Sequence, residues 1–163
     1  MASSNTLIQW TAAANEPPGS TVYATLDQRN SHLVLDFDAS SAEDGVFSGV
    51  LPRHYAGGGV TATIHWMATS GTTGSVVWTG AFERCNTDLD ADSFATGVDS
   101  STATPNSSAG IITSTPIAFT DGAQMDSLAV GEPFRFKLTR KVADAGDTMV
   151  GDAEVMAVEI KET

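Results

Sequence analysis

Alternating aspartates between residues 88 and 92 form the most suggestive ligand pattern in the chain. Asp88, Asp90 and Asp92 are each separated by one residue, and Asp99 follows at the position of a last ligand. Hard carboxylate oxygens with this spacing can wrap a calcium ion. Ser93, however, occupies the sixth position, where the sharp turn calls for glycine, and no helical pattern flanks the segment. The three aspartates are therefore a weak metal candidate, and an acidic surface loop is the favoured prediction.

A second group of carboxylates lies at the end of an expected strand. It consists of Asp36, Asp38, Glu43 and Asp44. Two carboxyl groups about 5–9.5 Å apart can hydrolyse a glycosidic bond. The sequence does not set any such distance, and charged turns commonly have this composition. An acidic turn is the prediction.

Other catalytic and cofactor-binding motifs are missing from the sequence. His32, His54 and His65 are too dispersed for a zinc pattern. No Gly-x-Ser-x-Gly nucleophile motif and no phosphate-binding loop are present. The only cysteine, Cys85, follows an apolar run at the end of an expected strand, where an inert thiol is favoured over a nucleophile. We therefore predict a protein that is not an enzyme and has no cofactor.

The three tryptophans allow two interpretations. Trp10, Trp66 and Trp78 could form a platform on which sugar rings stack. Trp66 and Trp78, however, are in phase with apolar neighbours along their segments, which favours core packing.

Charge and composition exclude several classes of partner. The chain has 8 Lys plus Arg against 20 Asp plus Glu, a formal net charge of −12. Nucleic acid is not an expected partner, because phosphate binding depends on clustered cations. No apolar run approaches about 18 residues, so no membrane span is expected. Residues 1–10 lack the features of a secretion signal, so we expect the protein to be made and folded in a cytosol.

Alternation of apolar and polar residues with a period of two recurs along the chain and predicts strands. The clearest patterns cover residues 32–37, 60–68, 75–84 and 133–140. Weaker patterns cover residues 7–11, 23–26, 45–51, 111–119 and 153–161. In the segment 111–119, Pro116 lacks a backbone donor and therefore indicates an edge strand.

Glycine- and proline-containing turns separate these segments, and no βαβ alternation is present. About eight or nine short strands of this kind predict an all-β, antiparallel β-sandwich, a jelly roll or a related Greek key. Residues 1–20 are expected to form an N-terminal arm or an edge segment, and residues 21–163 a single β-sandwich domain. The strand order does not follow from the pattern.

Two segments resemble a known family. Residues 49–66 (GVLPRHYAGGGVTATIHW) combine a Pro-x-x-Tyr-x-Gly-Gly turn with an alternating strand that ends at a tryptophan. Residues 131–140 (GEPFRFKLTR) agree with the same family. The chain is thus similar, from about residue 22 onward, to small jelly-roll virion structural proteins of tailed bacteriophages. The resemblance implies a jelly-roll sandwich that assembles on the particle, commonly as a homotrimer, without catalysis or a cofactor.

The most specific role implied by the resemblance is a capsid decoration or cement protein on the outer surface of the virion. It would bind the major capsid protein and stabilise the shell by bridging neighbouring subunits, after assembly in the host bacterial cytoplasm. The alternative is a tail or fibre-associated jelly-roll module that binds a host glycan, and a glycan-active enzyme is third. For the partner interface, the candidates are Arg53, His54 and Tyr55, of which Arg and Tyr are types frequent at binding hot spots. Leu7 and Trp10 are candidates as part of a docking arm.

Overall fold

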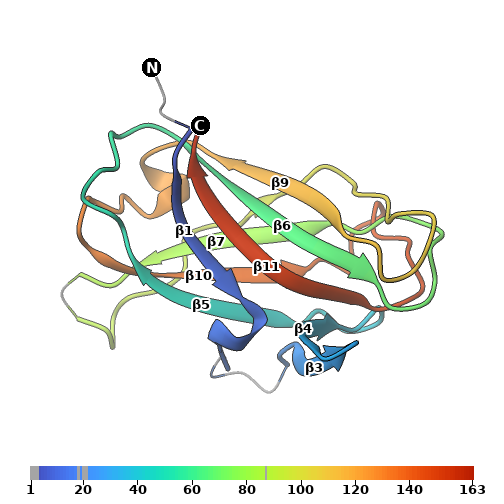
Figure 1. Cartoon of the computed structure of the whole chain (residues 1–163). Coiled ribbons are helices and arrows are strands. Elements are labelled where there is room, and N and C mark those ends of the chain that lie inside the picture. Colours follow the sequence, from blue (N-terminus) through green and yellow to red (C-terminus); the bar gives the residue numbers. More distant parts are fainter. Residues whose placement is uncertain (1–3, 18, 20–21, 87) are drawn as a thin grey trace.

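Two antiparallel β-sheets packed face to face make up the computed structural model, which describes residues 4–17, 19, 22–86 and 88–163 (Figure 1). Sheet I comprises β1 (Thr6–Thr11), β3 (Thr25–Arg29), β4 (His32–Phe37), β6 (Val60–Ala68), β9 (Thr113–Phe119) and β11 (Ala153–Glu162). Sheet II comprises β2 (Asn15–Glu16), β5 (Asp44–Val50), β7 (Trp78–Arg84), β8 (Val98–Asp99) and β10 (Pro133–Arg140). The helical elements are two short 3-10 helices, η1 (Ala12–Ala14) and η2 (Ala123–Met125). The predicted all-β sandwich of jelly-roll type is confirmed.

Strands that follow one another in the sequence mostly lie in opposite sheets. Sheet I runs β3-β4-β11-β6-β9, and sheet II runs β2-β5-β10-β7-β8. In sheet I, β4 pairs with the first part of β11 (residues 153–155), and β1 pairs with its later part (residues 157–161). The chain changes sheets at every connection except β3–β4 and β7–β8. Most strand neighbours are therefore distant in sequence, which is why local patterns could not predict the order. None of the helices in the described part of the chain is long and apolar enough to span a membrane.

The core lies between the sheets and follows the predicted alternation. On β10, Phe134, Phe136 and Leu138 are buried, and on β6 the even-numbered residues from Val60 to Ala68 are buried. Trp66 and Trp78 are fully buried and meet edge to face, with ring centroids 5.8 Å apart. Their assignment to the core is confirmed, since burial of such large rings stabilises the fold through both area and ring geometry.

Several strand boundaries agree with the prediction and two differ for clear reasons. Residues 32–37, 60–68 and 133–140 match β4, β6 and β10. β3 extends to Arg29, beyond the predicted end at residue 26, because the two-residue hairpin turn lies at Asn30 and Ser31, which both adopt positive φ angles (46° and 65°). β11 contains a register shift between Val155 and Ala157, so Val155 faces the core instead of Met156.

Two outer strands of sheet I, β9 and β1, contain residues for which the sequence made specific predictions. β9 ends the sheet, so Pro116 lies on an edge strand as predicted. Of the predicted N-terminal arm, residues 6–11 form β1, which pairs with β11 as an edge segment. Residues 1–3, 18, 20 and 21 of that arm lie outside the described part of the chain.

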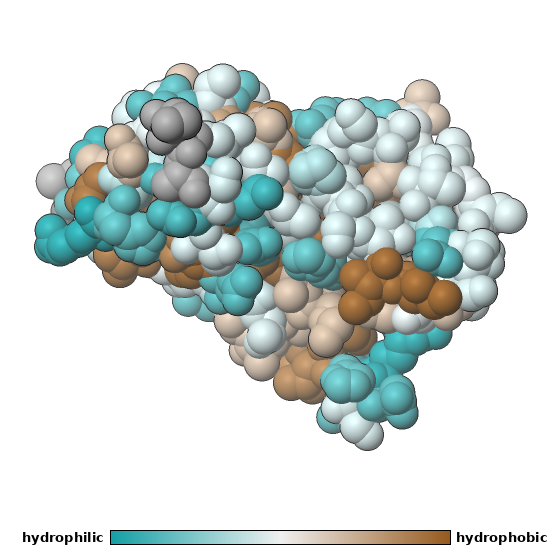
Figure 2. All heavy atoms as spheres, turned by 45° about the horizontal axis from the view of Figure 1, so that its top comes forward, coloured by the Kyte–Doolittle hydropathy of each residue, from teal (hydrophilic) through white to brown (hydrophobic). Residues whose placement is uncertain are grey.

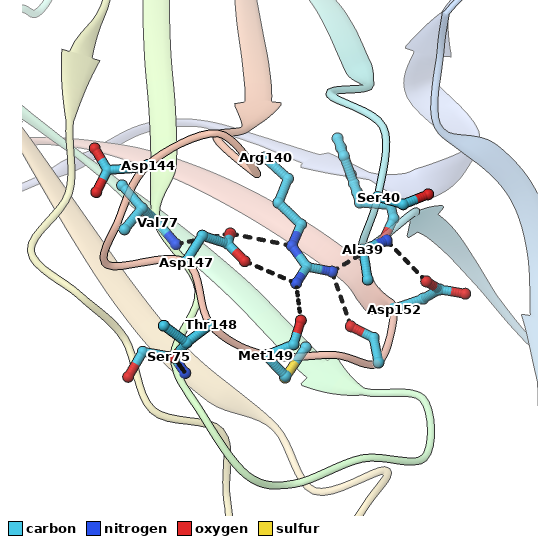
Figure 3. Close-up of polar contacts among 12 residues, drawn as sticks. Ala39, Ser40, Ser75, Val77, Arg140, Asp144, Asp147, Thr148, Met149 and Asp152 are labelled. Atoms are coloured by element: carbon cyan, nitrogen blue, oxygen red, sulfur yellow. Dashed lines mark hydrogen bonds and ion pairs between the residues drawn. The ribbon is translucent and has the colours of Figure 1, made fainter.

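A buried ion pair holds the loop between β10 and β11 to the sandwich (Figure 3). Arg140 is fully buried and donates to Asp147 through Nε at 3.1 Å and Nη2 at 2.9 Å. The same guanidinium donates to the carbonyl oxygens of Met149 at 2.6 Å and Gly151 at 2.9 Å. A guanidinium removed from water needs such partners on nearly every N–H. Arg140 thus fixes the loop from one side, and backbone hydrogen bonds from Thr148 and Met149 to the carbonyl of Ser75 hold it as well.

Candidate functional site

The acidic segment 88–92 forms an exposed loop after β7. The backbone carbonyl of Asp88 accepts from the N–H groups of Ala91 and Asp92, which closes a local turn. Asp99, the expected last ligand, lies on β8 and is hydrogen-bonded to Thr79 and ion-paired with Lys141. Within the residues that the structure describes, no three His, Cys, Asp or Glu side chains are grouped to hold a metal ion. Asp88, Asp90 and Asp92 are thus not joined by Asp99 in a calcium loop.

The second acidic group is divided by the fold. Asp44 accepts a hydrogen bond from Thr139, and Asp38 accepts from the hydroxyl of Ser40. Asp36 instead lies beside Glu154, its partner across β4 and β11. Burial raises the pKa of Asp36 to about 6, and the nearby carboxylates add to the effect.

Three of the predicted interface residues lie in the core. Leu7, Trp10 and Tyr55 are each 6–7% exposed, the Trp10 indole donates to the carbonyl of Ser48, and the Tyr55 hydroxyl donates to that of Gly58. Buried side chains offer no surface to a partner, which corrects the predicted contacts at these three positions. Their apolar rings and chains complete the core at the ends of the sheets. Arg53 and His54 are exposed, and their role at an interface stays a prediction.

A pocket of about 590 Å³, here called the sheet II pocket, opens on the outer face of sheet II. Three strands of the sheet, β5, β7 and β10, and the segment that follows β7 contribute to its walls. The lining residues are Ser48, Gly49, Glu83, Cys85, Asn86, Leu89, Pro133, Phe134 and Arg135. Its size falls within the usual range of small-ligand sites.

An ion pair forms the polar part of this pocket. Arg135 and Glu83 are directly opposite each other on β10 and β7. Nε of Arg135 donates to Oε2 of Glu83 at 2.6 Å, and Nη2 lies 2.5 Å from the same oxygen. The Glu83 side chain is only 3% exposed, whereas that of Arg135 is 40% exposed. Nη1 of Arg135 has no hydrogen-bond partner among the described residues, so the guanidinium can still donate to a ligand.

An aromatic ring holds the loop wall of the pocket in place. Phe94 lies over two outward-facing cations of β10, with its ring centroid 5.2 Å from Cζ of Arg135 and 4.8 Å from Nζ of Lys137. Such cation–π contacts are favourable at partly exposed sites. The N–H of Ala95 also donates to the carbonyl of Phe82 at 2.8 Å. Together these contacts tie the segment after β7 to the outer face of sheet II.

The remaining walls are apolar or unreactive. Leu89 is 74% exposed at the pocket mouth, and Pro133 is exposed on β10. Burial raises the pKa of the Cys85 thiol, so this residue stays protonated at neutral pH and is a poor nucleophile. The arrangement suits the binding of a ligand that has both apolar surface and hydrogen-bonding groups.

Sequence reasoning did not find this site. Alternation places Arg135 on the outward face of its strand, and the same pattern places Glu83 outward. Their meeting depends on the pairing of β7 with β10, which are 52 residues apart at this point. An outward Glu and an outward Arg on separate strands were the only signal available.

Comparisons with known proteins show the fold of the chain. No protein-family model matches it, and no curated protein matches it significantly. A family 35 carbohydrate binding module from an environmental isolate is similar with a TM-score of 0.55 and 12% identity, over 94% of this chain and 92% of that chain. The xylan-binding module CBM15 is similar with a TM-score of 0.54 and 12% identity, over 98% and 97%. The CBM22-2 xylan-binding domain from Paenibacillus barcinonensis Xyn10C gives 0.50 and 14%, over 96% and 99%.

These likenesses extend over nearly the whole length of both chains in each comparison. At 12–14% identity they show a shared fold. They provide no link to phage virion proteins. The chain therefore has the β-sandwich jelly-roll fold found in carbohydrate-binding modules.

Proposed function

We propose that the chain is a non-catalytic carbohydrate-binding domain that takes a neutral glycan in the sheet II pocket. The observation that carries this proposal is the Glu83–Arg135 pair within an open pocket that Leu89 and Pro133 also line. A guanidinium with spare N–H groups donates to sugar hydroxyls in a fixed geometry. Leu89 and Pro133 would contact the C–H faces of a sugar ring.

The charges around the pocket favour a neutral ligand over an anionic one. Glu83 neutralises Arg135 directly, and the loop beside the pocket carries Asp88, Asp90 and Asp92. An anionic sugar would therefore meet net negative charge at the rim. A neutral sugar needs only hydrogen bonds and apolar contact.

The fold supports the proposal. The similar structures are named as carbohydrate-binding or xylan-binding modules, and none of these names describes an enzyme domain. This is in keeping with the predicted absence of catalysis and favours the glycan-binding alternative over shell decoration. Because all three tryptophans are buried, sugar stacking on indole does not contribute.

A glycan array that carries xylans, other plant polysaccharides and bacterial surface glycans tests the proposal. Selective binding to a neutral glycan, lost in Arg135→Lys, is the expected result, because lysine keeps the charge beside Glu83 but lacks the planar fork. Arg84→Lys is the matched control, since Arg84 pairs with Glu132 outside the pocket. Absence of binding to every glycan, or binding that Arg135→Lys leaves unchanged, would refute the proposal.

Attachment to a phage shell is a second candidate function, favoured by one surface feature. Tyr23, Leu26 and Leu33 are exposed apolar side chains on β3, β4 and the segment before them. Exposed apolar groups that are close together often mark protein interfaces. The predicted homotrimer and contact with the major capsid protein would use such a surface. Light scattering of the purified protein and its copy number on particles test this function; a strict monomer and an absence from purified shells would reject it.

A further inference from the structure

The outer face of sheet I carries a second pocket, here called the sheet I pocket, of about 420 Å³. It lies between the β3–β4 hairpin and the loop that precedes β9. Figure 2 shows one compact hydrophobic patch toward the right-hand end of the molecule, within a surface that is otherwise mostly neutral or hydrophilic there. The lining residues are Arg29, Asn30, His32, Val34, Met67, Ala109, Gly110, Ile112 and Met156.

The arginine that lines this pocket, Arg29, is paired with a glutamate as Arg135 is, although the glutamate itself lies outside the lining. Nη1 of Arg29 on β3 lies 2.6 Å from Oε2 of Glu154 on β11. The glutamate side chain is 6% exposed and the arginine side chain 31% exposed, close to the values for Glu83 and Arg135. Each pocket is thus built around a guanidinium that is neutralised by a nearly buried glutamate and remains partly open to solvent.

Arg29 is held so that part of its guanidinium is available. Nη1 also donates to the carbonyl of Thr69 at 3.2 Å, which uses both of its hydrogens. Nε and Nη2 lie against Gly110, where a Cβ atom would be only 2.8 Å from Nε. Gly110 also has a φ of +78°. Glycine tolerates this backbone conformation, and its lack of a Cβ atom leaves room for the guanidinium of Arg29. Within the part of the chain that the structure describes, Nε and Nη2 have no hydrogen-bond partner.

The floor of the sheet I pocket is apolar. Val34 and Met67 are buried although they are on the outer face of the sheet, because the hairpin and the loop cover them. Met156, at the bulge of β11, and Ile112 complete the apolar wall. Flexible methionine side chains adapt to ligands of irregular shape. The floor therefore suits the C–H face of a ring.

The local charge again selects against anions. Asp36 lies beside Glu154, and Asp152 also acts on Asp36. Arg29 is the cation that faces these carboxylates in the lining of the pocket. A ligand that gains from the open N–H groups without adding negative charge is a neutral, hydroxyl-bearing ring.

We propose that the sheet I pocket is a second glycan site of the same chemical class, so that the domain is bivalent. This inference rests on the proposed function. The two pockets open on the outer faces of opposite sheets, so one short oligosaccharide cannot occupy both. Two separate glycan chains, or two distant parts of one chain, would be held at once, and the affinity for polymeric glycan would exceed that for a short one.

Titration of the full chain with xylohexaose, cellohexaose and chitohexaose, followed by amide chemical shifts and calorimetry, tests the inference. The expected result is two sites per chain, with separate shifts around Arg135 and around Gly110. Arg29→Lys and Arg135→Lys should each leave one site, and the double variant none. Arg84→Lys, which alters an Arg–Glu pair outside both pockets, should keep two.

A second variant separates loss of binding from loss of structure. Ile112→Asp places a charge at the mouth of the sheet I pocket and leaves the Arg29–Glu154 pair in place. It should also reduce the number of sites from two to one, with no change in the shifts around Arg135. One site in the wild type, with no shifts around Gly110, would overturn bivalency and leave the proposed function intact. No binding of any oligosaccharide, together with a negative array, would overturn both.

Discussion

Replacement of Arg140 by methionine is the sharpest test of how the sandwich is held together. Methionine matches the length of the aliphatic part of the side chain and removes only the guanidinium. In the wild type this group is fully buried and donates to the carboxylate of Asp147 and to the carbonyls of Phe37, Met149 and Gly151 (Figure 3). The substitution therefore leaves four acceptors without this donor at a site that water does not reach.

The structure sets the size of the expected effect. Asp147 is 2% exposed, and its remaining donor is the N–H of Val77 at 3.2 Å. Removal of one partner from a buried ion pair costs about 3–5 kcal/mol, because the other charge stays buried. The unpaired carbonyls add to this loss. Arg140→Met should thus reduce the free energy of unfolding by about 4 kcal/mol, a large part of the 5–15 kcal/mol typical of a domain.

Urea unfolding followed by the fluorescence of the buried tryptophans measures this change. Lys141→Met is the matched control, because Lys141 is the next residue and its pair with Asp99 is exposed at the surface; it should hardly move the midpoint. In the double variant Arg140→Met/Asp147→Asn, the unpaired charge is gone and about 1–2 kcal/mol should return. An Arg140→Met variant within 1 kcal/mol of the wild type, or a double variant no better than the single one, would refute the reasoning.

Two further predictions concern pH and packing. Burial raises the pKa of Asp36 to about 6, whereas its ordinary value is 3.8. The folded state therefore holds this proton more tightly than the unfolded state, and the free energy of unfolding decreases as the pH rises toward and through 6. Asp36→Asn should therefore exceed the wild type by about 1–2 kcal/mol at pH 8, after allowance for partial exposure, and the two should converge near pH 4 in urea titrations. Gly80→Ala would place a Cβ 2.8 Å from the rings of Phe119 and Phe136 and should cost about 1–3 kcal/mol, whereas Gly71→Ala, where the nearest atom is 3.6 Å away, should leave the melting temperature nearly unchanged. A melting temperature for Gly80→Ala equal to that of the wild type, or a pH-independent effect of Asp36→Asn, would contradict these expectations.

Alternation along single segments was enough to predict the sandwich. The pattern in residues 133–140 correctly separates the inward rings from the outward Arg135, because side chains on a strand point to opposite faces in turn. The same pattern places Arg140 inward, but a charged side chain is not expected in a core. Its burial depends on hydrogen-bond acceptors in the loop after β10, which the sequence did not predict. The bulge in β11, by contrast, changes the phase of the strand between Val155 and Ala157 without any local signal in the sequence.

The sequence by itself therefore determined the fold class, the burial of Trp66 and Trp78 and the edge position of Pro116, all of which follow from neighbouring residues. The two candidate pockets depend on contacts between strands that are distant in the chain. Arg135 and Glu83 are 52 residues apart, and Arg29 and Glu154 are 125 apart. Because the chain changes sheets at nearly every connection, these pairs form only when the strand order is complete. Only the tertiary structure could decide where the ligand-binding groups lie.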